Sequence, residues 1–254
     1  MKTLAISSQK GGVGKTTVSI NLAYSFAKSG KKVLLVDVDP QGSVGLSLTR
    51  KSSSLLGFYD YLGDASLSAE KVVVPTRMGT MSIVTAGQES VIGVETASSP
   101  EAVLRMKQFF ASVKEMDFDI CIVDTAAGLF GVTSDILKCV DAVLTPQQAE
   151  PLGIRSVPKM LEALTRLRNE NPKLKVLGVL FTMVQPYLKE SVEACSGIRN
   201  LLPSQLTFLT EITRHDVFVR ASARGLPIGV TEEGVKTSSV FDTLQEEIEE
   251  KLNA

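Results

Sequence analysis

The stretch Lys10-Gly11-Gly12-Val13-Gly14-Lys15-Thr16-Thr17 stands near the start of the chain and determines how its surroundings fold. An apolar run at 3–8 precedes it and an amphipathic stretch at 16–29 follows it, which predicts a buried strand, a glycine-rich turn and a helix. Glycines at such a turn let backbone N–H groups approach an anion, and the helix N-terminus adds partial positive charge. We therefore predict a loop that wraps the phosphates of a nucleotide.

Two side chains of this loop have a predicted chemical role. Lys15 can reach the β- and γ-phosphates, and the hydroxyl of Thr16 can ligate Mg²⁺. The pattern departs from the usual phosphate loop, because Gln9 stands at the position of the first glycine and Lys10 precedes the glycines. The predicted nucleotide contacts are Gly11, Gly12, Val13, Gly14, Lys15, Thr16 and Thr17.

Apolar runs alternate with amphipathic stretches along the chain. Further strand-like runs lie at 33–38, 120–124, 142–145 and 176–182, and helical patterns lie at 101–115, 154–169 and 189–201. Continuous apolar runs of this kind are typical of parallel strands covered on both faces. We therefore predict an α/β fold, a doubly wound and mostly parallel β-sheet flanked by helices, in a single domain over residues 1–254.

The segment 42–100 is less regular than the rest. It holds a possible short helix at 55–62 and strand signals at 72–74 and 82–84. We expect it to form insertions over the carboxyl ends of the strands.

The composition excludes several classes of protein. The chain has 254 residues, of which 44% are hydrophobic, and a formal net charge of −1, so its overall field would not attract nucleic acid. The three cysteines, Cys121, Cys139 and Cys195, are widely spaced, and His215 is the only histidine. We therefore expect no zinc or iron–sulfur site, and reduced cysteines of a cytoplasmic protein. No apolar run reaches the ~18 residues of a membrane-spanning helix.

Acidic residues stand at the ends of two predicted strands. Asp37 and Asp39 follow one apolar run, and Asp124 ends another. Carboxylates at the carboxyl ends of parallel strands face the ligand crevice of such a sheet. Either Asp37 or Asp39 can orient an attacking water or act on it as a base, with turn formation before Pro40 as the structural alternative. Asp124 is suited to hold Mg²⁺ directly or through water, with a helix cap as its structural alternative.

Together these motifs resemble one family, the deviant Walker A ATPases, which include ParA/Soj and MinD. The resemblance rests on the loop at 10–17, on Asp37-Val38-Asp39-Pro40-Gln41-Gly42 and on Asp124-Thr125-Ala126-Ala127-Gly128. Similarity to the ParA branch continues at 145–146, 150–155 and 177–183, and in Arg214 with 225–228. The resemblance thus covers nearly the whole chain.

The resemblance implies a P-loop NTPase fold, the cofactors ATP and Mg²⁺, and an active site shared by two subunits. Two monomers would sandwich two ATP molecules, and Lys10 would contact phosphate across the dimer interface. A second lysine of this kind neutralises transition-state charge only when the dimer forms. Asp39 would position or activate water. The implied catalytic residues are Lys10, Lys15 and Asp39, and the residues implied around the metal are Thr16, Asp39 and Asp124.

The ParA branch uses its later half for non-specific DNA binding, and this chain is basic there. Between Arg155 and Arg224 it has eleven Lys and Arg against six Asp and Glu. Binding without sequence preference needs only contacts of Lys and Arg to phosphates. The candidate DNA contacts are Lys189, Arg199, Arg214, Arg220 and Arg224. The resemblance further implies a weak ATPase that drives chromosome, plasmid or cargo partitioning, an ATP-bound homodimer, a ParB-like stimulator, and a cytoplasmic, nucleoid-associated location.

Departures from the family pattern leave other functions open. Ala126 and Ala127 stand where the family often has proline, and Val217 stands where Soj-like proteins tend to carry a second basic residue. These favour, as an alternative, a ParA-like positioning or regulatory ATPase that acts on a protein cluster without binding DNA. A third hypothesis is a metabolic ligase on the same fold, similar to dethiobiotin synthetase.

The last segment raises the question of a MinD-like membrane anchor. Its apolar residues, from Phe241 to Leu252, have helical spacing, but its polar side carries glutamates at 246, 247, 249 and 250. Anionic lipid repels an acidic face. We therefore expect no membrane contact, and a final helix that packs on the domain.

Overall fold

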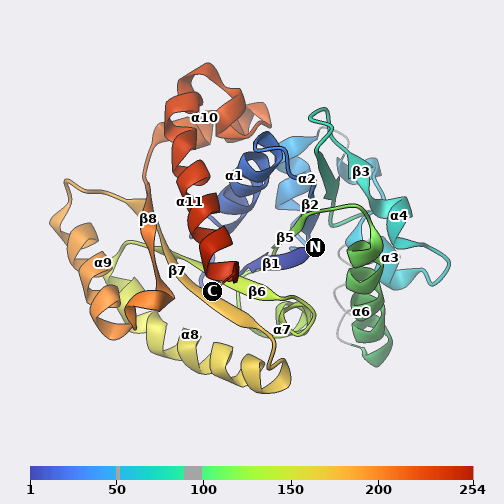
Figure 1. The fold of residues 1–254 in the computed structure, drawn as a ribbon, viewed down its shortest axis with the longest axis horizontal. Helices are drawn as coiled ribbons and strands as arrows, with labels where there is room; N and C mark the ends of the chain where they lie inside the picture. Colours follow the sequence, from blue (N-terminus) through green and yellow to red (C-terminus); the bar gives the residue numbers. More distant parts are fainter. Residues whose placement is uncertain (50–51, 89–98, 254) are drawn as a thin grey trace.

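The computed structural model describes residues 1–49, 52–88 and 99–253 (Figure 1). Within them one eight-stranded sheet runs in the order β3-β4-β2-β5-β1-β6-β7-β8. Every neighbouring pair is parallel except β3 and β4, which are antiparallel. The strands are β1 Lys2–Ile6, β2 Val33–Asp37, β3 Val74–Pro75, β4 Met81–Val84, β5 Ile120–Asp124, β6 Ala142–Gln148, β7 Lys175–Val184 and β8 Thr207–Thr213.

Helices connect the strands and cover both faces of the sheet. The α-helices are α1 Lys15–Lys28, α2 Ser43–Leu48, α3 Phe58–Gly63, α4 Ala69–Val72, α6 Pro100–Glu115, α7 Val132–Leu137, α8 Pro151–Glu170, α9 Lys189–Leu201, α10 Asp216–Arg224 and α11 Val235–Asn253. Short 3₁₀ turns are η1 Ser52–Ser54, η2 Ser204–Leu206, η3 Ile228–Val230 and η4 Glu232–Gly234. Figure 1 shows α11 in red beside α1 in blue.

Two hydrophobic cores lie on opposite faces of the sheet, because successive strand residues point to opposite sides. In β1, Leu4 and Ile6 join the core under α1, α10 and α11, whereas Ala5 joins the core under α6, α7, α8 and α9. The central strands β2 and β5 are fully buried along their length. Burial on both faces explains why these strands read as continuous apolar runs rather than as alternating ones.

The predicted fold, a doubly wound and mostly parallel sheet flanked by helices, is confirmed. The runs at 33–38, 120–124, 142–145 and 176–182 form β2, β5, β6 and β7. The segment 42–100 differs from the prediction, because β4 joins the sheet beside β2 instead of lying over the strand ends. The strand signal at 72–74 is confirmed only at its end, since α4 extends to Val72 and β3 begins at Val74.

The final helix packs on the domain, as predicted. Phe241, Leu244 and Ile248 are buried in the same core as α1. Polar contacts add to this packing, since Asp242 accepts hydrogen bonds from Ser25 and Lys28 of α1, at 2.8 and 3.0 Å. None of the helices in the described ranges has the length and apolar character needed to cross a membrane.

The register of the central strands brings three chain segments to one edge of the sheet. Asp124, the last residue of β5, is level with Ile6 of β1 and with Asp37 of β2. The glycine-rich loop follows β1, and Asp39 follows β2. Because the three strands are parallel, their carboxyl ends meet there and form the crevice in which such sheets bind ligands.

Candidate nucleotide-binding site

The glycine-rich loop between β1 and α1 has a backbone that favours glycine. Gly12 and Gly14 have φ angles of 75° and 89°, in the left-handed region where a side chain would be strained. Gly14 caps α1, whose N-terminal N–H groups receive no side-chain cap, and the first turn of α1 carries no acidic residue. The N-terminus of a helix leaves N–H groups unpaired, and these can bind an anion. The loop therefore has the backbone of a phosphate-binding site.

Lys15 and Asp124 form the charged centre of the site. Lys15 is 8% exposed, and burial lowers the pKa of its ammonium group while the carboxylates of Asp124 and Asp39 oppose this shift. Asp124 accepts a hydrogen bond of 2.7 Å on each oxygen, one from Thr16 and one from Ser19. Burial raises the pKa of Asp124 to about 6 in spite of these bonds. The Thr16 hydroxyl and the Asp124 carboxylate are thus in direct contact, as a shared role at Mg²⁺ requires.

Asp37 and Asp39 lie in different environments. Asp37 is fully buried and accepts hydrogen bonds from the backbone N–H groups of Asp39 and Val44, at 3.1 and 2.9 Å. Burial, and next the nearby charge of Asp124, raise the pKa of Asp37 well above its ordinary value. Asp39 is half-buried, and one of its oxygens accepts the N–H of Gln41 at 2.9 Å. Asp37 therefore holds the turn and the start of α2, which leaves Asp39 as the better candidate to act on water.

The loop after Asp124 is tied to the phosphate loop. Gly128 donates its N–H to the carbonyl of Ser8 at 3.0 Å, and Thr125 donates its hydroxyl to the carbonyl of Ile6 at 3.1 Å. Phe130 in this loop is 76% exposed. A change at the phosphates can therefore reach the loop at 125–131 through direct backbone contacts.

β7 supports the phosphate loop from the other side, and the sequence did not predict this. Thr182 donates its hydroxyl to the carbonyl of Val13 at 2.8 Å. The next residue, Met183, has a φ of 53°, the only positive φ of a non-glycine residue in the described ranges. Its Cε atom lies 3.8 Å from where a side chain on Gly14 would begin. Backbone strain of this kind is frequent at functional sites.

Lys10 does not turn into its own phosphate loop. Its ammonium group forms an ion pair with the carboxylate of Glu150, the N-cap residue of α8. The two side chains are 42% and 25% exposed, so the pair lies at the surface of the sheet's carboxyl edge. Lys10 is thus at the rim of the site, held by Glu150, for which the sequence predicted no role in the site.

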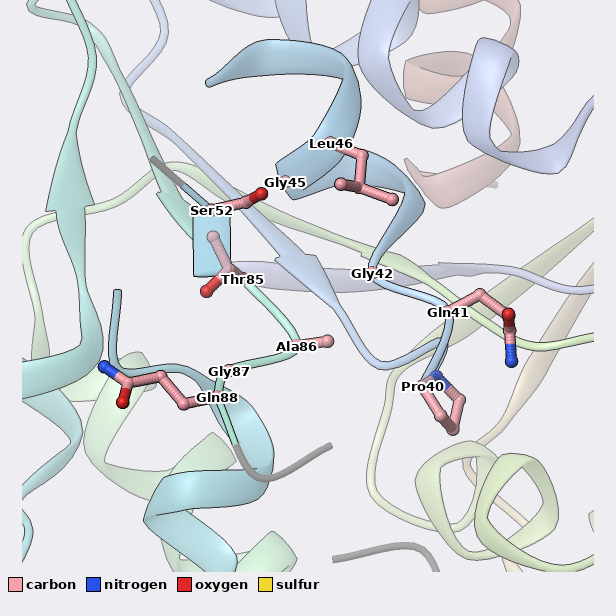
Figure 2. Close-up of a pocket in the computed structure, with 10 residues that line it drawn as sticks. All are labelled: Pro40, Gln41, Gly42, Gly45, Leu46, Ser52, Thr85, Ala86, Gly87 and Gln88. Atoms are coloured by element: carbon pink, nitrogen blue, oxygen red, sulfur yellow. The ribbon is translucent and has the colours of Figure 1, made fainter. Parts of the chain in front are cut away.

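A cavity of about 230 Å³ lies beside the turn that carries Asp39 (Figure 2). One wall runs from Pro40 to Leu46, and the other from Thr85 to Gln88 after β4. No residue of the phosphate loop lines it. The cavity therefore borders the turn at 40–42 and α2 rather than the phosphate loop.

The five candidate DNA contacts fall into three environments. Lys189 and Arg214 are exposed beyond the carboxyl ends of β7 and β8. Arg199 is 35% exposed; it donates to Glu211 and to the carbonyl of Phe208, and its guanidinium lies 4.7 Å from the centre of the Phe181 ring. Arg220 and Arg224 lie one turn apart on α10 and both face Glu233. Four of the five side chains are thus exposed, and Arg199 is partly buried by contacts within the fold.

Comparison with known proteins places the chain among nucleotide-binding proteins. A profile of the AAA domain family matches residues 1–176. The chromosome-partitioning ATPase Soj of Treponema pallidum is 31% identical over 251 residues, 97% of this chain and 96% of Soj. Protein IncC of Escherichia coli is 27% identical over 90% of the chain, which spans 63% of that relative's length.

Solved structures agree with this placement. Apo McdA of Cyanothece has a TM-score of 0.84 at 23% identity, over 98% of this chain and 99% of McdA. Cobyrinic acid a,c-diamide synthase of Mycobacterium smegmatis, solved with an ATP analogue and magnesium, has a TM-score of 0.75 at 25% identity, over 89% of this chain and 93% of the synthase. The predicted cofactors, ATP and Mg²⁺, agree with the groups bound to the synthase.

The fold and the site define a P-loop NTPase, with a glycine loop, a buried lysine and a strand-end carboxylate. The residues present fit Mg²⁺ and the phosphates of ATP, because a hydroxyl and one or two carboxylates are the protein ligands that Mg²⁺ takes beside phosphates. Within that class the chain belongs to the ParA/MinD family of deviant Walker A ATPases, together with the Soj and ParA partition ATPases.

Proposed function

We propose that the protein is an ATP-hydrolysing switch that forms a dimer around two ATP molecules, binds non-specific DNA in that state and drives partitioning with a ParB-like partner. The observation that carries this proposal is Lys10. It precedes the glycines, and its side chain points to Glu150 rather than to its own loop. A lysine placed at the rim is available to the phosphates of a second subunit, which would make the active site a shared one.

The residues of one chain would divide the work as follows. The glycine loop binds the phosphates, Lys15 neutralises their charge, and Thr16 and Asp124 hold Mg²⁺. The metal, when bound, supplies charge stabilisation to the transferred phosphoryl group. Asp39 orients the attacking water or takes its proton. Lys10 of the partner subunit adds positive charge where negative charge develops, and hydrolysis is slow until that lysine arrives.

DNA binding is proposed for the basic side chains that remain exposed. Lys189 and Arg214 both follow the carboxyl ends of neighbouring strands, β7 and β8, and Arg214 donates its backbone N–H to the carbonyl of Val184 at the end of β7. Arg220 and Arg224 form a second group on α10. Arg199 is the least suited of the five, because its donors already bind Glu211 and Phe208.

A continuous set of contacts supports nucleotide control of the α10 surface. Asp37 holds the N–H of Val44 at the start of α2. Gly225, which ends α10 with a φ of 70°, packs against the carbonyl of Ser47 in α2, where an added Cβ would approach to 3.1 Å. A movement of the turn at Asp39 on ATP binding would therefore shift α10 through α2.

The test is a binding titration with a labelled DNA duplex of mixed sequence, in the presence of Mg²⁺ and either ATP or ADP. We expect binding with ATP that is strongly weakened by salt and much weaker with ADP, because phosphate contacts release counterions. Weak DNA binding that is equal with ATP and with ADP would contradict the proposed DNA binding. It would favour the alternative, a positioning ATPase that acts on a protein cluster.

A ligase function is a second candidate, favoured by the similarity to cobyrinic acid a,c-diamide synthase. A ligase would complete its active site within one chain, so Lys10→Ala would leave its turnover unchanged. In a switch with a shared site, the same change removes dimer-dependent hydrolysis. Cytoplasmic and nucleoid-associated location is part of the switch proposal, and fluorescence microscopy of the tagged protein tests it.

A further inference from the structure

On the surface of α10, two arginines face one carboxylate of the chain itself. Arg220 donates from Nε to Glu233 Oε2 at 2.7 Å, and Arg224 Nη2 lies 4.0 Å from Glu233 Oε1. Each oxygen of one carboxylate thus faces one arginine. The three side chains are 49%, 56% and 50% exposed, so the site is open to solvent.

Glu233 is held in this position by a compact turn. Thr231, which is 6% exposed, accepts the N–H of Gly234 at 3.1 Å and donates its hydroxyl to the carbonyl of Ile228 at 2.8 Å. A side chain on Gly234 would meet the carbonyl of Ile228 at 2.2 Å, so the turn lies tightly against η3. The backbone that carries Glu233 is therefore fixed facing α10.

The geometry points to Glu233 as a phosphate mimic that occupies a nucleic-acid phosphate site formed by Arg220 and Arg224, and that weakens DNA binding by competing for it. Carboxylate and phosphate oxygens take the same charge-assisted hydrogen bonds from arginine. A DNA phosphate that enters between the two arginines must displace the carboxylate, and the exposed pair costs little to separate. Glu233 then sets how tightly, and with what salt dependence, α10 holds DNA. This inference extends the proposed DNA binding by assigning one contact and its competitor.

The neighbouring residue offers a matched control. Glu232 is exposed, lies in the same turn and forms no ion pair within the described residues. Glu233→Gln and Glu232→Gln remove the same charge from adjacent positions, so they differ in the local contact and share the change in overall field.

The experiment measures the affinity of both variants and the wild type for a fluorescein-labelled duplex of mixed sequence, with Mg²⁺ and ATP, at several salt concentrations. We expect Glu233→Gln to bind roughly two- to fivefold tighter, the range that corresponds to one exposed ion pair. The slope of log K against log salt should steepen by about one, as one added phosphate contact requires. Glu232→Gln should gain clearly less, and ATP hydrolysis without DNA should be unchanged in both variants.

A third variant tests whether the gain in DNA affinity depends on Arg220. Arg220→Ala in the Glu233→Gln background should return the affinity and the slope to the wild-type values or below them. Equal affinities and slopes of Glu233→Gln and Glu232→Gln would overturn the inference, and so would a gain that survives Arg220→Ala. If wild-type binding does not depend on ATP but Glu233→Gln still exceeds Glu232→Gln, the anion site stands and the proposed ATP-switched function fails. If the wild type binds DNA only with ATP but the two variants have equal affinities, the ATP-switched function stands and the anion site fails.

Discussion

Three aspartates at the carboxyl edge of the sheet have different surroundings, and these decide what each can do. Asp124 is fully buried against the hydroxyls of Thr16 and Ser19. Asp37 is fully buried against two backbone N–H groups. Asp39 alone is half-buried, within the field of Lys15. These surroundings support the proposal that Asp124 holds the metal and Asp39 acts on water, while Asp37 stabilises the turn.

Replacing Asp39 should separate hydrolysis from binding. Asp39→Ala is expected to lower ATP hydrolysis by roughly 100-fold or more, the contribution of a positioned base, while ATP affinity stays within a few-fold of wild type. Lys15→Ala is the matched change, because it removes the phosphate contact and should abolish ATP binding itself. Phosphate release and calorimetric ATP titration measure the two effects. Normal hydrolysis by Asp39→Ala would mean that Asp37, and not Asp39, acts on water.

The buried charge of Asp124 should make the ligand-free protein less stable at neutral pH. Its pKa is about 6 in the folded protein against an ordinary 3.8. Between these values the folded state keeps a proton that the unfolded state loses, so stability falls as pH rises from about 4 to 6 and stays lower above. The difference corresponds to about 3 kcal/mol, at roughly 1.4 kcal/mol for each pKa unit.

Asp124→Asn removes this penalty. In the presence of a chelator and without nucleotide, we expect its thermal midpoint to exceed that of wild type by several degrees at pH 8 and to match it near pH 4. Stabilisation by Mg²⁺ and ATP should be lost in the same variant. A midpoint below wild type at pH 8 would show that the hydrogen bonds to Thr16 and Ser19 outweigh the cost of the buried charge.

Among the helices and strands, the sequence predicted the central strands and missed β8 at one edge of the sheet. β2 and β5 are buried on both faces and therefore appear as unbroken apolar runs. β8 is an edge strand in which only some residues are buried, and its pairing with β7 is irregular, so its pattern is broken. α10 has only nine residues, too few for a clear helical period.

The residues of the candidate site likewise include some that the sequence predicts and some that it does not. The loop at 10–17 and the strand-end aspartates were predictable, because local motifs fix their chemistry. Glu233 was not, because its contact with Arg220, 13 residues earlier, depends on how the chain folds back after α10. Glu150 and Thr182 were not, because they meet their partners only through the topology of the sheet. Glu150 is 140 residues from Lys10 in the chain, and Thr182 is 169 residues from Val13. Pairings of this kind depend on which strands become neighbours, which no local pattern records.

Replacing Arg199 and Arg214 separately tests which basic side chains stabilise the fold and which bind DNA. Arg199 joins α9 to β8 and β7 through Glu211, Phe208 and Phe181. Arg199→Ala should lower the free energy of unfolding by about 1–2 kcal/mol, from the loss of these contacts, and leave DNA affinity unchanged.

Arg214→Ala should instead affect DNA binding and not stability, because the Arg214 side chain is exposed. We expect unchanged stability, weaker DNA binding and a salt slope reduced by about one. Urea unfolding and the DNA titration measure both properties for each variant. Equal losses of DNA affinity in the two variants, both folded, would contradict the structural role of Arg199.

At the scale of the whole molecule, helix α1 links the phosphate loop to the region after α10. Asn21 of α1 accepts the N–H of Ile228 at 2.8 Å and donates to the carbonyl of Thr17 at 2.8 Å. Tyr24 donates to the carbonyl of Gly229 at 3.3 Å. The helix that begins at the phosphates thus also holds η3, against which the turn of Glu233 packs.

Asn21→Ala should weaken the coupling between nucleotide and DNA. The change leaves the buried N–H of Ile228 without its acceptor, at a cost of about 1–3 kcal/mol in stability. We expect the ratio of DNA affinities with ATP and with ADP to shrink while the affinity for ATP itself is kept. Tyr24→Phe, which removes a longer and less buried hydrogen bond, serves as the milder control. An unchanged ratio in Asn21→Ala would place the coupling in α2 alone.

We propose that ATP joins two chains through Lys10. Sedimentation of Asp39→Ala with saturating ATP and Mg²⁺ tests it most directly, because hydrolysis no longer separates the subunits. We predict twice the chain mass of 27.3 kDa with ATP and the single mass with ADP, and a return to the single mass when Lys10→Ala is added. A single mass with ATP bound, or a dimer that persists without Lys10, would show that ATP does not join two chains through this lysine.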